Sequence, residues 1–267
     1  TPSEPRAIPS PAPTEFRMSP GSQVIDIAHL RKSCAQCSLQ QLCLPAGITA
    51  PDMQRLDQLV QKRRPLERGE SLFRAGAPMR SLYVAREGAF KTVALGQDGS
   101  AQVIGFHLPG ELIGLDGLGD GQHRCEAEAL EPAQVCEVPF TELERIAAQI
   151  PSLQHQLLRI IGKSMGRDHD HLEMLGRRMA DERVALFLHG LSERLRNLGR
   201  DPQTFSLPMS REEIASYLGL VIETVSRTFS RLQDEGLIAV RGRKLQILDD
   251  KRLNRLAHDP EQHRSRG

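Results

Sequence analysis

Three of the five cysteines in this 267-residue chain lie close enough in sequence to bind a single metal centre. Cys34, Cys37 and Cys43 follow a C-x2-C-x5-C spacing. Three thiolates need a fourth ligand to complete a tetrahedral zinc site or an iron-sulfur cluster, and the chain offers Cys125 and Cys136 for it. An odd number of cysteines disfavours a disulfide framework. The spacing alone leaves zinc, an iron-sulfur cluster and reduced thiols without a metal as open alternatives.

A second group of polar side chains has the chemistry to bind DNA. Ser210 and Glu213 form a capping box that predicts the start of a helix, and residues 219–221 form a short glycine-containing turn before a second helix. One face of the second helix carries Glu223, Ser226, Arg227 and Arg231. Carboxylate, hydroxyl and guanidinium groups can bind base edges and phosphates, whereas the alternative is a solvated face with a Glu223–Arg227 ion pair.

The composition is that of a globular protein with room for two modest domains, since 39% of the residues are hydrophobic and 26% are charged. A formal net charge of +1 means that any contact with DNA must come from locally arranged residues. No apolar run approaches the roughly 18 residues that a membrane span needs, and the N-terminal stretch lacks the apolar core of a signal peptide. We therefore expect a cytoplasmic protein.

The elements that must position these side chains follow from changes in pattern along the chain. Residues 1–28 are rich in proline and predict a disordered arm. Residues 29–150 hold the cysteine-rich segment and an antiparallel, jelly-roll-like β-roll, because short β-type runs at 71–73, 82–84, 90–95 and 103–106 alternate with turn glycines. Residues 181–250 predict a winged helix-turn-helix, and residues 251–267 a flexible C-terminal tail. The expected fold class is α+β.

Residues 151–180 predict a dimerisation helix. One face of this helix, which we call the seam, carries residues at alternating steps of three and four: Leu158, Ile161, Met165, Asp168, Leu172 and Leu175. Such a narrow apolar stripe favours pairing with a second copy, although packing within one chain is the alternative. Asp168 is the exception, because two carboxylates brought together in a parallel dimer would cost on the order of 1 to 3 kcal/mol. This repulsion would hold the dimer near its dissociation threshold, unless Asp168 only faces solvent.

The helix-turn-helix region resembles the DNA-binding element of the CRP/FNR family. The matching blocks are Tyr217-Leu218-Gly219-Leu220 and Glu223-Thr224-Val225-Ser226-Arg227, and the Glu, Ser, Arg triple is the FNR-type variant. The resemblance implies that Glu223, Ser226 and Arg227 read a two-fold symmetric TTGAT-N4-ATCAA-like operator. The two reading helices of the dimer would then lie about 34 Å apart, one turn of DNA.

The sensor region is similar to the same family, and the resemblance runs from about His29 to Ile247. The matching blocks are Cys37-Ser38-Leu39, Gly105-Phe106-His107-Leu108 and Val135-Cys136-Glu137-Val138-Pro139-Phe140. The resemblance implies an oxygen-labile 4Fe-4S cluster bound by Cys34, Cys37, Cys43 and Cys125, with Leu42 shielding it and Cys136 as a buried structural thiol. It further implies an oxygen-responsive homodimeric regulator of anaerobic gene expression that contacts RNA polymerase through exposed loops of the β-domain.

Two other classes of protein fit the sequence less well. Residues 110–114 with His123 and Arg124 resemble the phosphate cassette of cyclic-nucleotide receptors, but Leu115 and Cys125 replace the residues that would hold the nucleotide. An enzyme would need a catalytic constellation, and the chain has neither a glycine-rich phosphate loop nor a serine nucleophile motif. We therefore expect no enzymatic activity, and a zinc- or thiol-based redox regulator of the same fold is the main alternative.

Overall fold

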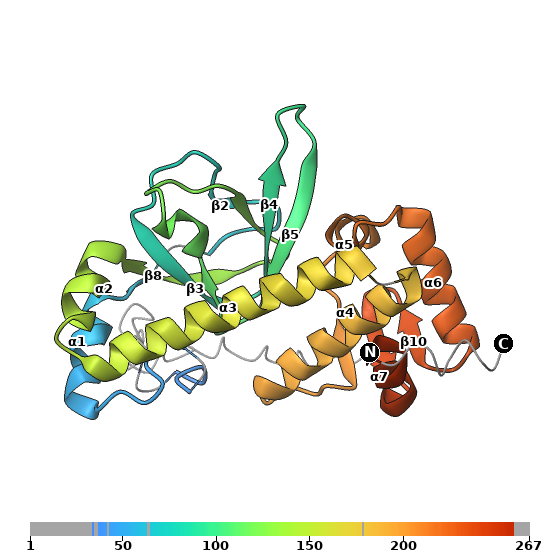
Figure 1. The fold of residues 1–267 in the computed structure, drawn as a ribbon. Coiled ribbons are helices and arrows are strands. Elements are labelled where there is room, and N and C mark those ends of the chain that lie inside the picture. Colours follow the sequence, from blue (N-terminus) through green and yellow to red (C-terminus); the bar gives the residue numbers. More distant parts are fainter. Residues whose placement is uncertain (1–33, 35–36, 42, 63–64, 178, 259–267) are drawn as a thin grey trace, which may run out of the picture. The chain divides into compact units, whose positions relative to one another are not determined.

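The computed structural model describes residues 34, 37–41, 43–62, 65–177 and 179–258 (Figure 1). These residues belong to one compact unit, Ser33–Gly267. The predicted arm over residues 1–28, the proposed shielding residue Leu42 and the last nine residues of the expected tail, 259–267, lie outside the described residues. Within the described part, no helix is both long and apolar enough to span a membrane.

The N-terminal half is a β-roll built from two four-stranded antiparallel sheets. The first sheet has the order β1 (Gln61–Lys62), β8 (Gln134–Pro139), β3 (Ser81–Glu87) and β6 (Leu112–Ile113), and the second has the order β2 (Ser71–Phe73), β7 (Glu126–Ala129), β4 (Phe90–Leu95) and β5 (Ala101–His107). The four β-type runs expected from the sequence fall in β2, β3, β4 and β5, which confirms the predicted sheet region.

The turn between β3 and β4 depends on Gly88. This residue has a φ of 73°, and an added Cβ would lie 2.7 Å from the Cβ of Ala133. A side chain is therefore excluded by backbone conformation and by space. The glycine lets the chain reverse tightly, so that β4 begins the second sheet directly after β3.

Two separate cores lie on opposite faces of the first sheet. The inner core lies between the two sheets, and its members include Phe73, Tyr83, Phe90, Ile113 and Val135. The outer core is covered by the helices α1 (Ala50–Leu59), α2 (Phe140–Ala147) and the start of α3 (Pro151–Arg177). Its buried residues include Leu44, Leu56, Val84, Val138 and Leu153. Because adjacent strand residues point to opposite faces, β3, β6 and β8 each supply residues to both cores.

The long helix α3 connects the β-roll to the C-terminal half, as Figure 1 shows. A short 3-10 helix, η3 (Leu115–Leu118), follows β6 in the sensor. The C-terminal half comprises α4 (Ala180–Asn197), β9 (Thr204–Ser206), α5 (Arg211–Leu218), α6 (Ile222–Asp234), β10 (Ile238–Arg241), β11 (Lys244–Ile247) and α7 (Asp250–His258). The strands form one sheet in the order β10-β11-β9, which is the wing of the predicted winged helix-turn-helix.

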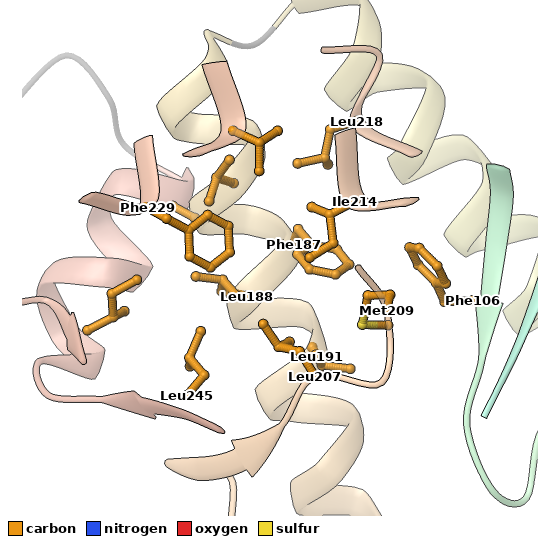
Figure 2. Close-up of a cluster of buried hydrophobic side chains, with 14 of the residues drawn as sticks. Phe106, Phe187, Leu188, Leu191, Leu207, Met209, Ile214, Leu218, Phe229 and Leu245 are labelled. Atoms are coloured by element: carbon orange, nitrogen blue, oxygen red, sulfur yellow. The ribbon is translucent and has the colours of Figure 1, made fainter. Parts of the chain in front are cut away.

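The core of the C-terminal half holds the helix-turn-helix together. Figure 2 shows Phe187, Leu188 and Leu191 of α4 facing Ile214 of α5 and Phe229 of α6. Leu188 and Ile214 are fully buried. Burying one such aliphatic side chain stabilises the fold by roughly 1.5 to 3 kcal/mol, so α4 is the platform on which both helices of the motif are packed.

The flexible tail expected from residue 251 is wrong for its first part, because α7 spans Asp250–His258. Leu253, Leu256 and Ala257 recur at helical spacing and are buried. The helix begins where the backbone N–H of Arg252 donates to Asp249 Oδ1 at 2.9 Å. An amphipathic helix covering the core of the C-terminal half therefore replaces the expected tail.

Candidate functional site

Four of the five cysteines line one cavity at the outer core of the sensor. These are Cys34, Cys37, Cys43 and Cys136, and Leu39, Leu44, Leu56 and Val84 are among the residues that complete the cavity wall. All five cysteines of the chain are described, and none forms a disulfide. The cavity therefore presents sulfur atoms in mostly apolar surroundings.

Local hydrogen bonds fix the segment that carries the first three cysteines. The backbone N–H of Cys34 donates to Asp57 Oδ1 of α1 at 2.8 Å. The backbone N–H of Cys43 donates to Leu39 O at 3.0 Å, and Gln156 Nε2 of α3 donates to Cys43 O at 3.1 Å. Gln156 is only 6% exposed, so this bond ties the cysteine segment directly to α3.

The electrostatic surroundings disfavour thiolates in the absence of a cation. Burial, with a smaller contribution from the neighbouring Asp57, raises the pKa of the Cys34 thiol to about 12. Burial also raises the pKa of Cys43, and the nearby thiol of Cys136 adds to the shift. Within the described ranges, no three ligating side chains are yet gathered closely enough to hold a metal ion. A bound cation would offset the cost of burying several thiolates together.

The expected fourth ligand, Cys125, is not brought to the other three, and this assignment is corrected. Cys125 belongs to the inner core and is 3% exposed. Its thiol donates to Asp116 Oδ2 at 3.3 Å, and Asp116 also lies 3.4 Å from Nδ1 of His123. Cys125 precedes β7 of the second sheet, whereas the cysteine segment packs on the far face of the first sheet.

Cys136, expected from the sequence to be a structural thiol, lies where Cys125 was expected. It is in β8, where its register partners are Lys62 of β1 and Val84 of β3. Its neighbour Val135 is in the inner core, and Cys136 packs on the outer core. Because side chains alternate along a strand, the sequence predicts that Val135 and Cys136 lie on opposite faces of the sheet. It does not predict which face contacts the cysteine segment.

The predicted helix-turn-helix is confirmed with its capping box. Ser210 Oγ accepts from the backbone N–H of Glu213 at 3.1 Å, and Glu213 Oε2 accepts from the backbone N–H of Ser210 at 2.6 Å. Such a cap is worth about 1 kcal/mol. Gly219 ends α5 at a φ of 60°, a conformation that favours glycine, and α6 follows after two residues.

The second helix of the motif, α6, has one apolar face and one polar face. Val225, Phe229 and Leu232 are buried, whereas Glu223, Ser226, Arg227 and Arg231 are exposed. Arg227 Nε donates to the backbone carbonyl of Glu223 at 3.3 Å, and not to the Glu223 carboxylate. Arg231 differs from the other three because its guanidinium pairs with Asp181 of α4.

The predicted seam on α3 is largely uncovered within one chain. Leu158, Met165 and Leu172 are 58%, 54% and 65% exposed, and Asp168 is also exposed. Ile161 and Leu175 are half-buried. Partial burial raises the pKa of the Asp168 carboxyl despite the nearby Arg167. The exposed leucines and methionine argue against the alternative in which this stripe packs only within its own chain.

The residues that resemble the phosphate cassette of cyclic-nucleotide receptors form ion pairs within the chain. Glu111 pairs with Arg194 of α4 at 2.6 Å and with Arg167 of α3 at 3.3 Å, and the arginines hold the pKa of its carboxyl below the usual range despite burial. Arg124 is 70% exposed and pairs with Asp120. Of the two charged residues expected in a nucleotide site, Glu111 therefore joins the β-roll to α3 and α4, and Arg124 lies at the surface.

Comparison with known proteins gives matches to both halves. Residues 182–256 match the Crp-like helix-turn-helix domain, and residues 63–149 match the cyclic nucleotide-binding domain. The chain is 46% identical to the transcriptional activator protein Anr of Pseudomonas protegens, over 86% of this chain and 94% of that protein. It is 38% identical to the fumarate and nitrate reduction regulatory protein of Escherichia coli K12, over 84% and 90%. The structure of FixK2 from Bradyrhizobium japonicum matches with a TM-score of 0.67 and 33% identity, over 74% and 96%.

Proposed function

The chain belongs to the FNR-type branch of the CRP/FNR family of DNA-binding transcription regulators, and from this premise we propose that an oxygen-labile iron-sulfur cluster controls its activity. It is a regulator that binds DNA as a dimer, and not an enzyme. The observation that carries the proposal is that four cysteines line one cavity at the sensor surface nearest α3. A DNA target requires a cytoplasmic location.

The donor set fits a sulfur-ligated iron centre. The proposed ligands are the four thiols of Cys34, Cys37, Cys43 and Cys136, which share one cavity. A 4Fe-4S cluster, when bound, supplies iron-sulfur bonds that oxygen breaks. The apolar wall formed by residues such as Leu39 and Leu44 limits access of water to the sulfur atoms. Leu42, next to Cys43, remains the proposed shielding residue.

The bond from Gln156 to Cys43 gives a route from the sensor to the dimer seam. Loss of the cluster would release the cysteine segment. This segment packs against the first turns of α3 in the outer core, which includes Leu44 and Leu153. Movement there shifts the helix whose exposed seam forms the dimer. Because only a dimer presents two reading helices at operator spacing, this shift controls DNA binding.

On the DNA side, Glu223, Ser226 and Arg227 are the proposed base-reading residues for a TTGAT half-site. They are exposed at the N-terminal part of α6, which is the part of a recognition helix that contacts base edges. Arginine suits guanine, and a carboxylate suits the cytosine amino group. RNA polymerase is the proposed partner of the bound dimer, through exposed turns of the β-roll.

The experiment that tests this function is anaerobic purification followed by exposure to air. We expect a straw-brown protein with about four iron and four sulfide per chain that shifts a TTGAT-N4-ATCAA duplex and loses colour and binding in air. A duplex with both half-sites scrambled is the control. Colourless, zinc-loaded protein would support the redox alternative of the same fold and contradict the iron-sulfur proposal.

Replacing Asp168 with alanine is expected to keep the protein dimeric in air. Two opposed carboxylates in the seam disfavour the dimer by on the order of 1 to 3 kcal/mol, so their removal strengthens it by about 5- to 150-fold. Sedimentation of air-exposed protein measures the monomer fraction. The matched control is Asp170→Ala, which removes another exposed carboxylate that lies outside the seam on the same helix. An unchanged monomer fraction in Asp168→Ala would end this account of the coupling.

A further inference from the structure

The carboxylate of Asp181 connects α4 to the reading helix at two points. Its Oδ1 accepts a hydrogen bond from Thr228 Oγ1 at 3.2 Å, and its Oδ2 pairs with Nη2 of Arg231. Thr228 is 4% exposed, so the first of these bonds lies at the packed face of α6. Asp181 lies in the first turn of α4, where a negative charge is also favoured by the helix dipole.

The guanidinium of Arg231 lies near two carboxylates of its own chain. Besides the pair with Asp181, its Nε lies 4.0 Å from Oε1 of Glu235. Glu235 in turn lies 3.9 Å from the guanidinium of Arg252 on α7. Arg231 is therefore paired within its own chain before any DNA binds, in contrast to Arg227, whose Nε donates to a backbone carbonyl.

The two bonds to Asp181 fix the rotation of α6, which apolar packing alone does not fix. The contacts of Val225, Phe229 and Leu232 hold α6 against the core, but hydrophobic contacts are non-directional. Hydrogen bonds to base edges tolerate only a few tenths of an ångström in length. Thr228 and Arg231 are three residues apart on α6, so two bonds to one carboxylate fix the rotation of the helix about its axis.

We infer that Asp181 is a positioning residue for DNA reading, which holds α6 in register through Thr228 and Arg231, and that Arg231 does not contact DNA. The inference rests on the proposed reading role of Glu223, Ser226 and Arg227. It replaces the expectation that Arg231 belongs to the DNA-binding set. The alternative role for Arg231 is a phosphate contact, and the two roles differ in their dependence on salt and sequence.

The test compares Asp181→Asn, Arg231→Gln, Thr228→Val and the Asp181→Asn/Arg231→Gln double variant as full chains with the cluster in place. Anisotropy titrations use the TTGAT-N4-ATCAA duplex and a scrambled duplex between 50 and 300 mM KCl. We expect each single variant to bind the operator about 3- to 10-fold more weakly, and the double variant to be no weaker than the weaker single variant. For Arg231→Gln, binding to the scrambled duplex and the salt slope should stay at wild-type values.

The matched control is Arg196→Gln, which removes an exposed ion pair with Glu193 within α4. It should bind both duplexes as the wild type does. A phosphate contact predicts instead that Arg231→Gln weakens both duplexes equally and lowers the salt slope by about one. That result, or operator binding by Asp181→Asn as tight as that of the wild type, would overturn the inference.

Hydrogen exchange separates this inference from the proposed function. The amides of α6 should exchange at least about threefold faster in Asp181→Asn and Arg231→Gln, while those of α5 should exchange at the wild-type rate. This measurement needs no DNA. If the wild-type protein does not bind the TTGAT-N4-ATCAA duplex, the proposed operator is wrong. Unchanged amide exchange in α6 of the variants would separately refute the positioning role.

Discussion

Replacing Cys136 with serine is expected to abolish cluster binding, whereas replacing Cys125 with serine should leave it intact. Cys136 shares a cavity with Cys34, Cys37 and Cys43, and a serine hydroxyl is a poor ligand for iron that prefers thiolate sulfur. Cys125 lies in the inner core, where it donates to Asp116. A serine hydroxyl can keep that hydrogen bond, so the sensor core should tolerate the change.

The measurement is iron and sulfide per chain after anaerobic reconstitution, with visible absorption as a second readout. We expect the Cys136→Ser protein to retain less than about a tenth of the wild-type iron and the Cys125→Ser protein to retain nearly all of it. Thermal unfolding of both metal-free proteins is the control for folding. The reverse result, with iron lost in Cys125→Ser and kept in Cys136→Ser, would refute the ligand set proposed from the cavity.

The contrast between the two cysteines shows where prediction from the sequence ends. Both lie in or next to β-type segments, and their spacing to Cys43 does not separate them. What separates them is register, because β8 pairs with β1 and β3 and so directs Val135 inward and Cys136 outward. Pairing between strands that are distant in sequence cannot be predicted from neighbouring residues, so the fourth cysteine ligand could not be chosen from the sequence alone.

Features that depend on neighbouring residues were predicted well. The capping box at Ser210, the glycine turn at Gly219 and the strand runs each need only a few adjacent side chains, and the structure confirms them. The helix α7 was missed although Leu253, Leu256 and Ala257 have helical spacing, because a short polar segment near a chain end resembles a tail. The pairing of Arg231 with Asp181 joins two helices and had no local signal.

Replacing Leu172 with aspartate is expected to convert the anaerobic dimer into a folded monomer. Leu172 is 65% exposed within one chain, so the substitution removes little intrachain packing. In a dimer the seam would lose two buried leucines, each worth about 1.5 kcal/mol or more, and would gain two carboxylates beside those of Asp168. The dissociation constant of the dimer should therefore rise at least about 100-fold. Sedimentation and far-ultraviolet circular dichroism measure the mass and the fold.

The same substitution at Leu95 is the matched control, because this leucine is 54% exposed at the end of β4 and lies outside the seam. Leu95→Asp should remain dimeric and bind the operator normally. Leu172→Asp should retain its iron, since the cysteine cavity is formed by a different part of the chain, yet should lose operator binding because a monomer presents one reading helix. An iron-loaded Leu172→Asp protein that still sediments as a dimer would show that the α3 seam is not the interface. In that case cluster loss would have to act on DNA binding through the contacts between the sensor and the C-terminal half, such as the 2.9 Å ion pair between Lys91 of β4 and Glu213 of α5.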